Sequence, residues 1–505
     1  MIKAGYITKE VSFKLRGIDF HFSLSQGLFS SADIDSGTRF LLKTLSRVLD
    51  EDAAAGRSPP RYVLDAGCGI GVIGICAAAV IMAMGPARQD TAYTGPAPIG
   101  APRFGGVLVR AQDRDELARL ITMYNAVKNG IPPSTLETHT EPLLAGHENA
   151  RWDLILSNIP AKTGGPVLKD FVRRSTGLLN PGGRVIMVTV HTLVDFFREE
   201  ISAAGAELEW EEKSRREPRR GHQVCPGTAC GVPPVNDSVK EKDAEYSVFV
   251  FGGKAAAAGA VVKAGRGFLT RHPFYVRASV DCQIEDIPLH IETVHGASGF
   301  DQPGGAVLAA AKLIRRIGAE RLFPAPDLSG KTAHNAGAPI LIHEPGQGFF
   351  PCWLLEFAYR KVPQRQPWVL VLSGRNILAL EAARHNTEAV LKPAAEAEAL
   401  PALLLVPAVD LRLGAEALLE AAAGRPYHFI AVFPELLPPS SIPKEADQFA
   451  ALWEALAALL TAGGVFIAGF SSTEAERFER KKLAGFTRLE DIKRKGFRAL
   501  GYKRR

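Results

Sequence analysis

The chain has 505 residues, of which 46% are hydrophobic and 23% are charged, and its formal net charge is +6. This is the composition of a folded globular protein, and it excludes an intrinsically disordered chain. At about 150 residues per domain the length predicts three domains, although single α/β domains often exceed about 200 residues.

The predicted elements of the first half alternate between strands and helices. Residues 11–24 alternate around Gly17 as a β-hairpin does, and the stretch from Asp35 to Leu49 has helical periodicity. The later elements are a buried strand at 61–67, a glycine-rich loop and an alanine-rich helix, strands at 106–112, 151–161 and 182–190, and a helix at 113–130. This order predicts a doubly wound, mostly parallel sheet that binds ligands at the carboxyl ends of its strands.

An internal repeat runs through the sequence. Four blocks of the first half recur in the same order in the second half, at offsets between 261 and 281 residues. The matched residues are Gly37 and Gly305, Asp65 and Glu344, Asn125 and Asn386, and Gly182 and Gly463. The repeat predicts two tandem α/β, Rossmann-like domains, each preceded by a β-hairpin. Their expected limits are residues 1–253 and 268–505, joined by the Ala/Gly-rich linker 254–267. The Gly/Pro-rich stretch 82–106 has the composition of an insertion.

A glycine-rich loop, Asp65-Ala66-Gly67-Cys68-Gly69-Ile70-Gly71, follows the first buried strand. Glycines let a backbone approach a ligand closely, and the helix start that follows favours negative charge. Gly69, Gly71 and Gly74 also fit a dinucleotide fingerprint, but the acidic residue expected about 20 positions later is missing. Asp65 can pair with an ammonium group, which a pyrophosphate lacks. The loop therefore favours a nucleoside that carries an amino acid over a dinucleotide.

Two further carboxylates follow neighbouring strands. Asp113 ends the second strand, where it can accept both ribose hydroxyls of a nucleoside or, alternatively, cap the next helix. Glu141 follows the third predicted strand, where it can border an adenine edge or lie on the surface without a ligand.

The strand WDLIL ends in Ser157-Asn158-Ile159-Pro160-Ala161. With this segment the chain resembles the class I S-adenosylmethionine-dependent methyltransferases, and in particular the methyltransferase small domain group, which includes 16S ribosomal RNA guanine-N2 methyltransferases. Four blocks carry the resemblance: LFSSADIDSGTRFLL, LDAGCGIGVIG, DRDELARLITMYNA and LILSNIPAKTGGPV. They cover most of residues 10–252.

The resemblance implies a role for each matching residue. Asp65, Gly67, Gly69, Gly71 and Asp113 would bind the cofactor, and Asp35, Gly37 and Thr38 would lie beside its methionine end. Asn158, Ile159 and Pro160 would hold the target amine, with Phe29, Ala161 and Lys162 next to the substrate. The exocyclic amine of a nucleic-acid base is a poor nucleophile, because its lone pair is delocalised into the ring of the base. Two acceptors, the Asn158 side-chain oxygen and the Ile159 carbonyl, would aim that lone pair at the methyl group.

The motif departs from the family pattern of Asn-Pro-Pro followed by an aromatic residue. Ile159 still supplies a backbone carbonyl, and Pro160 still biases its predecessor to an extended conformation. Ala161 cannot stack on a base. Stacking then has to come from elsewhere, with Phe29 as the candidate, or the substrate is not a base.

The second copy departs further. By sequence matching, Glu344 replaces Asp65, Phe350 replaces the third loop glycine, Gly374 replaces Asp113, and the Asn158 region reads AVFPELLP. These changes predict a copy that kept the fold and lost the cofactor. Residues 477–505 carry 12 basic and 3 acidic residues, which predicts a basic C-terminal tail that holds RNA or, since FRALGYK alternates, a strand that completes the second sheet.

The sequence thus predicts an S-adenosylmethionine-dependent RNA methyltransferase acting on a guanine N2 amine of ribosomal RNA. Alternatives are adenine-N6 methylation, glutamine-N5 methylation of a protein, and a non-catalytic RNA-binding or assembly protein. A cytoplasmic location is expected, because no signal peptide opens the chain and the six cysteines form no framework. We expect no metal, since His222, Cys225 and Cys230 lack a fourth ligand, and no membrane span, since glycines interrupt the apolar run 66–87.

Overall fold

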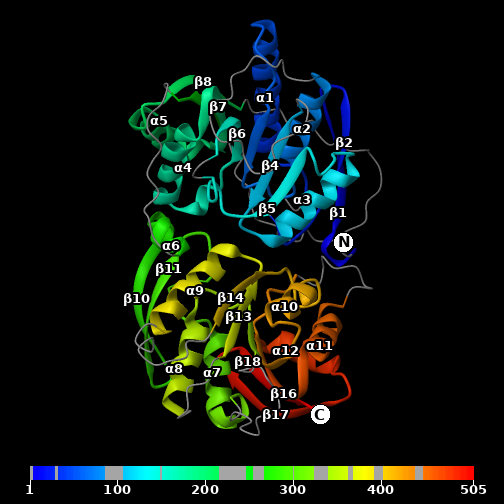
Figure 1. The fold of residues 1–505 in the computed structure, drawn as a ribbon, viewed down its shortest axis with the longest axis vertical. Coiled ribbons are helices and arrows are strands. Elements are labelled where there is room, and N and C mark those ends of the chain that lie inside the picture. Colours follow the sequence, from blue (N-terminus) through cyan, green and yellow to red (C-terminus); the bar gives the residue numbers. More distant parts are fainter. Residues whose placement is uncertain are drawn as a thin grey trace, which may run out of the picture.

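The computed structural model describes residues 4–28, 32–85, 106–147, 150–214, 246–253, 267–299, 301–323, 339–361, 368–391, 402–437 and 447–505. These residues form two α/β halves, one above the other in Figure 1, each with its own seven-stranded sheet. The predicted insertion 82–106 and linker 254–267 lie almost wholly outside the described residues, as do His222, Cys225 and Cys230.

The first half begins with a hairpin, as expected. Its strands β1 (Lys9–Leu15) and β2 (Ile18–Leu24) pair antiparallel through a turn in which Arg16 and Gly17 both have positive φ. The side chain of Asn125 fastens this hairpin to the body, because it bonds both the N–H and the carbonyl of Ser23. The same amide donates to the carbonyl of Ile70 in the glycine-rich loop.

The first sheet has the order β5-β4-β3-β6-β7-β9-β8 and is parallel except at β9. Its strands are β3 (Tyr62–Ala66), β4 (Leu108–Asp113), β5 (Leu136–Thr140), β6 (Trp152–Asn158), β7 (Leu179–Val190), β8 (Glu207–Lys213) and β9 (Tyr246–Gly252). The helices are α1 (Ser36–Ala54), α2 (Val72–Ala83), α3 (Glu116–Lys128), α4 (Gly165–Gly177) and α5 (Val194–Ala203). The chain order reverses between β3 and β6, where open α/β sheets bind ligands.

The second sheet repeats that order as β14-β13-β12-β15-β16-β18-β17. Its strands are β12 (Pro339–His343), β13 (Val369–Gly374), β14 (Ala402–Pro407), β15 (Tyr427–Val432), β16 (Leu460–Ser471), β17 (Phe486–Arg494) and β18 (Phe497–Arg504), and its hairpin is β10 (Val276–Ile284) and β11 (Ile287–Val294). The helices are α6 (Phe268–Arg271), α7 (Gly305–Ile317), α8 (Phe349–Lys361), α9 (Ile377–Leu391), α10 (Ala415–Ala421), α11 (Gln448–Leu459) and α12 (Ser472–Arg480).

Two tandem α/β domains, each preceded by a hairpin, are therefore confirmed. The C-terminal segment is not a tail, because β18 pairs with β16 and buries Leu500 and Tyr502 in the core of the second half. The alternative that the segment completes the sheet is the correct one. None of the described helices is both long and apolar enough to span a membrane.

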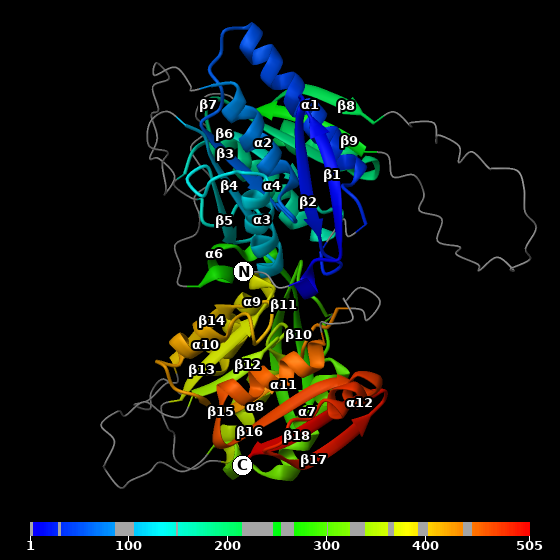
Figure 2. The ribbon, with the colours of Figure 1, turned by 90° about the vertical axis from the view of Figure 1, so that its right-hand side faces the viewer.

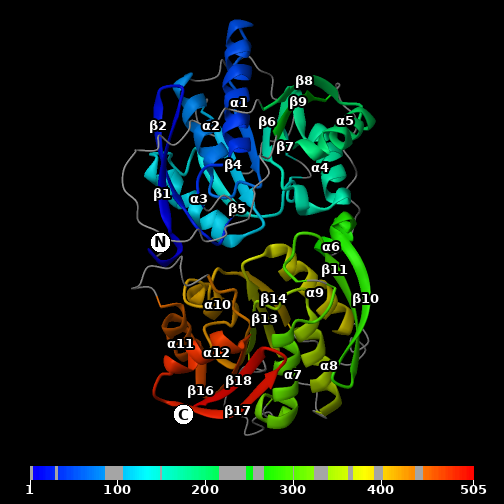
Figure 3. The same ribbon diagram turned by 180° about the vertical axis from the view of Figure 1, so that it is seen from behind.

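The carboxyl edges of the two sheets face each other (Figures 2 and 3). The loop after β4 and the loop after β13 meet in an antiparallel bridge between Asp115 and Asn376. Glu116 N–H donates to the Arg375 carbonyl at 2.9 Å, and Ile377 N–H donates to the Arg114 carbonyl at 2.9 Å. The repeat offset of 261 residues relates these two bonds, so the halves pair through equivalent residues.

Candidate functional site

The carboxyl edge of the first sheet gathers most of the predicted site. Asp65 lies in β3 and is fully buried, and its Oδ2 accepts a hydrogen bond from Gly74 N–H in α2 at 2.8 Å. Only glycine fits at position 74, because a Cβ there would lie 2.9 Å from that oxygen. The other oxygen, Oδ1, is buried and has no hydrogen-bond partner among the described residues. Burial raises the pKa of Asp65 to about 7.

The glycine-rich loop is held against Asp113 at the end of β4. Gly67, Gly69 and Gly71 all have positive φ, and Gly69 N–H donates to Asp113 Oδ2 at 3.1 Å. The other carboxylate oxygen, Oδ1, accepts from Asp115 N–H at 3.0 Å. Burial raises the pKa of Asp113, and the nearby negative charge of Asp115 raises this pKa further. The helix cap that was the alternative role of Asp113 is made instead by Asp115, whose side chain accepts from Leu117 N–H at the start of α3.

The predicted methionine-end residues and the predicted catalytic asparagine lie together. Asp35 caps α1 by accepting from Thr38 N–H at 3.0 Å and from the Thr38 hydroxyl at 2.6 Å. Asn158, at the end of β6, directs its Nδ2 at Asp35 Oδ1 (3.1 Å) and at Thr38 Oγ1 (3.0 Å). Because the carboxylate can only accept, the amide orientation is fixed and Asn158 Oδ1 is the atom left to accept from a substrate.

The residues after Asn158 are those predicted to hold the target amine and to lie next to the substrate. Ile159 N–H donates to the Val188 carbonyl at 3.1 Å, and no described residue donates to the Ile159 carbonyl. The Pro160 carbonyl accepts hydrogen bonds from the N–H and the hydroxyl of Thr163. Ala161 and Lys162 are exposed in the short helical turn that follows.

Some predicted residues remain apart from this cluster. Phe29 lies outside the described residues. Glu141 directly follows β5, and its charge acts on Arg110 and, across the domain interface, on Tyr275 and Glu381. Its place at an adenine edge stays a prediction.

Tyr246 at the start of β9 was missed by the sequence reading. Its ring packs against Gly37, where an added Cβ would lie 2.8 Å from two ring carbons. The second half repeats this contact between Phe497 and Gly305. Tyr246 therefore borders the α1 side of the edge that holds Asp35 and Asn158.

The strand registers correct the alignment of the two copies. Val63 faces Val109 in the first sheet, and Ile340 faces Leu370 in the second. This register puts Ile342, not Glu344, in the place of Asp65, and puts Glu344 in the place of Gly67, with φ of 56° and 82° respectively. The other two loop glycines are kept as Gly346 and Gly348, which also have positive φ. Phe350 thus lies within α8 and replaces no loop glycine.

The second edge is filled by its own side chains. Glu344 occupies the space beside Gly374, whose added Cβ would lie 2.9 Å from its Oε2, and Glu344 accepts from Arg375 N–H at 2.8 Å. Phe433 stands where Asn158 stands in the first half, and its ring packs edge-on against Phe350 with centroids 4.8 Å apart. This edge therefore lacks the two carboxylates and the amide of the first.

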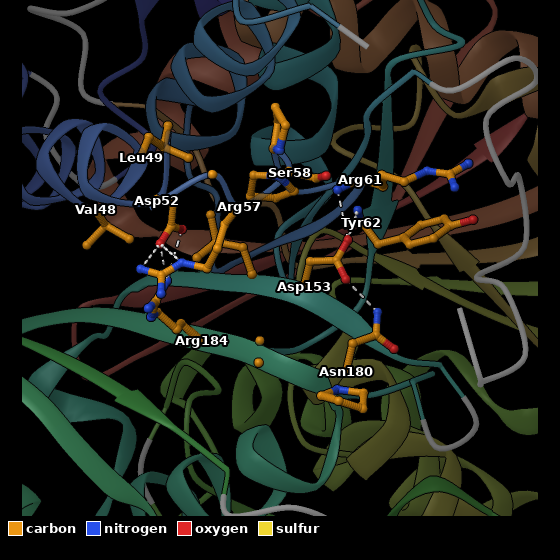
Figure 4. A pocket seen from close by; sticks show the side chains of 17 residues that line it. Val48, Leu49, Asp52, Arg57, Ser58, Arg61, Tyr62, Asp153, Asn180 and Arg184 are labelled. Atoms are coloured by element: carbon orange, nitrogen blue, oxygen red, sulfur yellow. Dashed lines mark hydrogen bonds and ion pairs between the residues drawn. The ribbon is translucent and has the colours of Figure 1, made fainter. Parts of the chain in front are cut away.

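A hollow of about 590 Å³ lies at the other end of the first sheet (Figure 4). Ion pairs of Asp52 with Arg57 and Arg184 close one side of it, and Asp153 is used by the backbone N–H groups of Arg61 and Tyr62. It contains none of the predicted site residues. Among the described residues no cluster of three or more His, Cys, Asp or Glu side chains could hold a metal.

Residues 19–84 match the family model described as methyltransferase small domain. The chain resembles the class I S-adenosylmethionine-dependent methyltransferases. It is 26% identical over 178 residues to the uncharacterized protein YbxB of Bacillus subtilis (strain 168), an alignment that covers 35% of this chain and 72% of that protein.

Among solved structures, the T. thermophilus 16S rRNA N2 G1207 methyltransferase (RsmC), in complex with AdoMet and guanosine, is similar with a TM-score of 0.55. The match covers 99% of both chains at 14% sequence identity. At this identity the likeness is one of fold, and it extends over both halves.

Proposed function

We propose that the protein is an S-adenosylmethionine-dependent methyltransferase whose first half is catalytic and whose acceptor is an exocyclic amine, the guanine N2 of ribosomal RNA. The observation that carries the proposal is the fixed amide of Asn158. Its Nδ2 is tied to Asp35 and Thr38, which leaves its Oδ1 as the atom that can accept a hydrogen bond from an amine.

The residues of the first edge fit such a cofactor. The partnerless Oδ1 of Asp65 is a buried acceptor suited to an ammonium group. Asp113 lies at the end of β4, where a carboxylate can accept hydrogen bonds from ribose hydroxyls. The three loop glycines allow a ligand to approach the backbone closely. When bound, S-adenosylmethionine supplies a methyl group on a positively charged sulfur.

The chain's own residues would then orient the amine. Asn158 Oδ1 and the Ile159 carbonyl each accept one N–H, which turns the nitrogen lone pair toward the methyl group. Positive charge grows on that nitrogen as the new N–C bond forms and the S–C bond breaks, and the two acceptors stabilise this charge. The amine then loses one proton to solvent. Orientation of this kind is worth about 7–11 kcal/mol in favourable cases.

RNA as the acceptor rests on coarser support. The fold likeness to an rRNA methyltransferase covers both halves. Exposed lysines, among them Lys482, Lys493, Lys495 and Lys503, lie on the last strands of the second half and in the loop before them. Adenine N6 and protein glutamine N5 present the same NH₂ group to Asn158, and Ala161 offers no ring that would favour a base.

Calorimetry with S-adenosylmethionine on the full chain tests the cofactor. We expect one site per chain, with a Kd about tenfold to a hundredfold higher in Asp113→Ala. The absence of any heat of binding in a titration of the folded wild-type chain would contradict the proposal. Mapping of the nucleotide that loses its methyl group in a deletion strain tests the acceptor, and an unmethylated protein glutamine would instead support the glutamine alternative.

A non-catalytic assembly role is the second candidate. The observation that favours it is the edge of the second half, which is filled by its own side chains. This role predicts RNA binding by the full chain without any S-adenosylmethionine site, so the same titration separates the two.

A further inference from the structure

Arg375 of the second half reaches across the interface to the first. It lies in the loop between β13 and α9 and is 8% exposed. Its Nε donates to Asp115 Oδ1 at 3.1 Å and its Nη2 donates to Asp115 Oδ2 at 2.5 Å, so both oxygens of one carboxylate are held by one guanidinium. Bidentate pairs of this kind fix geometry as well as charge.

Asp115 in turn holds the proposed ribose carboxylate. Its backbone N–H donates to Asp113 Oδ1, and Asp113 Oδ2 accepts from Gly69 in the glycine-rich loop. The Asp115 side chain also starts α3 through Leu117 N–H. A shift of Asp115 would therefore displace both the Asp113 carboxylate and the loop that it contacts.

The same guanidinium touches the other margin of the site. Arg375 Nη2 donates to the Gly27 carbonyl at 2.9 Å, at the end of the hairpin from which the chain runs on to Asp35. The contact is close, because a Cβ on Gly27 would lie 3.2 Å from Arg375 Nη1 and 3.0 Å from Leu117 Cδ2. One side chain of the second half thus contacts the segments that lead to both ends of the proposed cofactor site.

The reciprocal contact lacks this charge pair. The equivalent of Asp115 is Asn376, whose Nδ2 donates to the Gly296 carbonyl at 2.9 Å. The equivalent of Arg375 is Arg114, whose guanidinium packs against Gly296. The pairing is therefore symmetric in its backbone, but its partly buried ion pair acts on the catalytic half alone.

We propose that Arg375 is a positioning residue through which the second half sets the affinity of the first half for its cofactor. The inference rests on the proposed function, because the ligand is S-adenosylmethionine at the Asp113 edge. It gives the second half a role in cofactor binding by the first half, beyond packing against it.

The test compares S-adenosylmethionine dissociation constants of full-length variants by calorimetry. Arg375→Met is expected to raise Kd about tenfold, as a misplaced positioning group does, with kcat at saturating cofactor nearly unchanged. Arg375→Lys should recover only part of the affinity, because an ammonium cannot bind both carboxylate oxygens in the same geometry. Asp115→Asn keeps the helix cap and should weaken binding as Arg375→Met does.

The matched control is Tyr6→Phe. It removes another hydrogen bond between the halves, from Tyr6 to Asp410 Oδ2, but leaves the Asp115–Asp113 contacts intact. This variant should keep the wild-type Kd. The double variant Arg375→Met/Asp115→Asn should bind no more weakly than the worse single variant, because both changes remove one pair.

A wild-type Kd in Arg375→Met, with a Tm lowered as in Tyr6→Phe, would overturn the inference and leave Arg375 as a structural contact. Equal loss of affinity in Tyr6→Phe and Arg375→Met would overturn it as well, since any weakening of the interface would then suffice. Absence of binding by the wild-type chain would instead refute the proposed function.

Discussion

At the carboxyl edge of the first sheet, Asp65, Asp113 and Asn158 present two carboxylates and an oriented amide. At the same three positions the second sheet has Ile342, Gly374 and Phe433. The backbone around these positions is nearly unchanged, down to the positive φ at Gly346 and Gly348. The two edges therefore differ in their side chains, while the backbone that supports them is kept.

The largest expected effect is on catalysis by the first edge. Asn158→Ala removes one of two acceptors for the amine and should lower kcat about 10²–10³-fold, as loss of one preorganised group does in other enzymes. The Kd for S-adenosylmethionine should change little. In the second half, Phe433→Ala is the matched change: we expect a lower Tm from the lost contact with Phe350 and an unaltered kcat. A fall in kcat there would break the contrast between the halves.

Cofactor binding should separate the two edges next. Asp113→Ala removes the carboxylate proposed for the ribose and should raise the Kd about tenfold to a hundredfold, since hydrogen bonds to a charged group contribute about 1.5–3 kcal/mol. Glu344→Gln in the second half is the control and should leave the Kd unchanged. Equal losses in both variants would mean that the second edge binds ligand too.

A smaller difference concerns pH. Burial holds the pKa of Asp65 near 7, above its ordinary value of 3.8, so the folded chain favours the protonated form. The unfolded chain ionises first, and the free energy of unfolding should therefore fall between about pH 4 and about pH 7. Asp65→Asn keeps an acceptor for Gly74 N–H and should flatten this part of the profile in urea titrations without ligand. Parallel profiles for both proteins would show that Asp65 does not titrate there.

The smallest effect tests RNA binding by the second half. Lys493→Ala/Lys495→Ala removes two exposed charges near the turn between β17 and β18 without disturbing the sheet. If these lysines meet phosphates, the slope of log K against log salt should fall by about 0.7 for each contact with single-stranded RNA. Lys14→Ala/Lys43→Ala removes the same charge from the first half and is the control. Deleting residues 477–505 would not be informative, because it removes two strands of the sheet.

Much of the fold was predictable from local patterns. The hairpin around Gly17, the strand before Asp65 and the end of α3 at Asn129 follow from period, turn chemistry and caps, which depend on neighbouring residues. The match of Asp65 with Glu344 was wrong by two residues, because both are acids near a strand end. The register of β12 depends on its backbone pairing with β13, which the sequence of β12 alone does not indicate.

The interface could not be predicted in the same way. Arg375 and Asp115 are 260 residues apart, and the block DRDELARLITMYNA that contains Asp115 does not indicate a partner in the second half. The offset of 261 that aligns Asn125 with Asn386 does relate Arg114 to Arg375, but nothing in the sequence says that equivalent residues touch. In the C-terminal segment, whose charge led to the prediction of a basic tail, three arginines form ion pairs that composition does not reveal: Arg488 with Glu479, Arg494 with Glu285, and Arg498 with Asp491.

The bridge between Asp115 and Asn376 has a consequence for how such a chain can diverge. In a dimer of identical subunits, a residue on the two-fold axis meets its own copy, so an aspartate there would face an aspartate. A covalent link between the halves removes this restriction, and the two sides can then mutate independently. Dilution also cannot separate them, because the tether keeps their effective concentration high. The chain thus has the geometry of a symmetric pair together with the freedom to specialise each member.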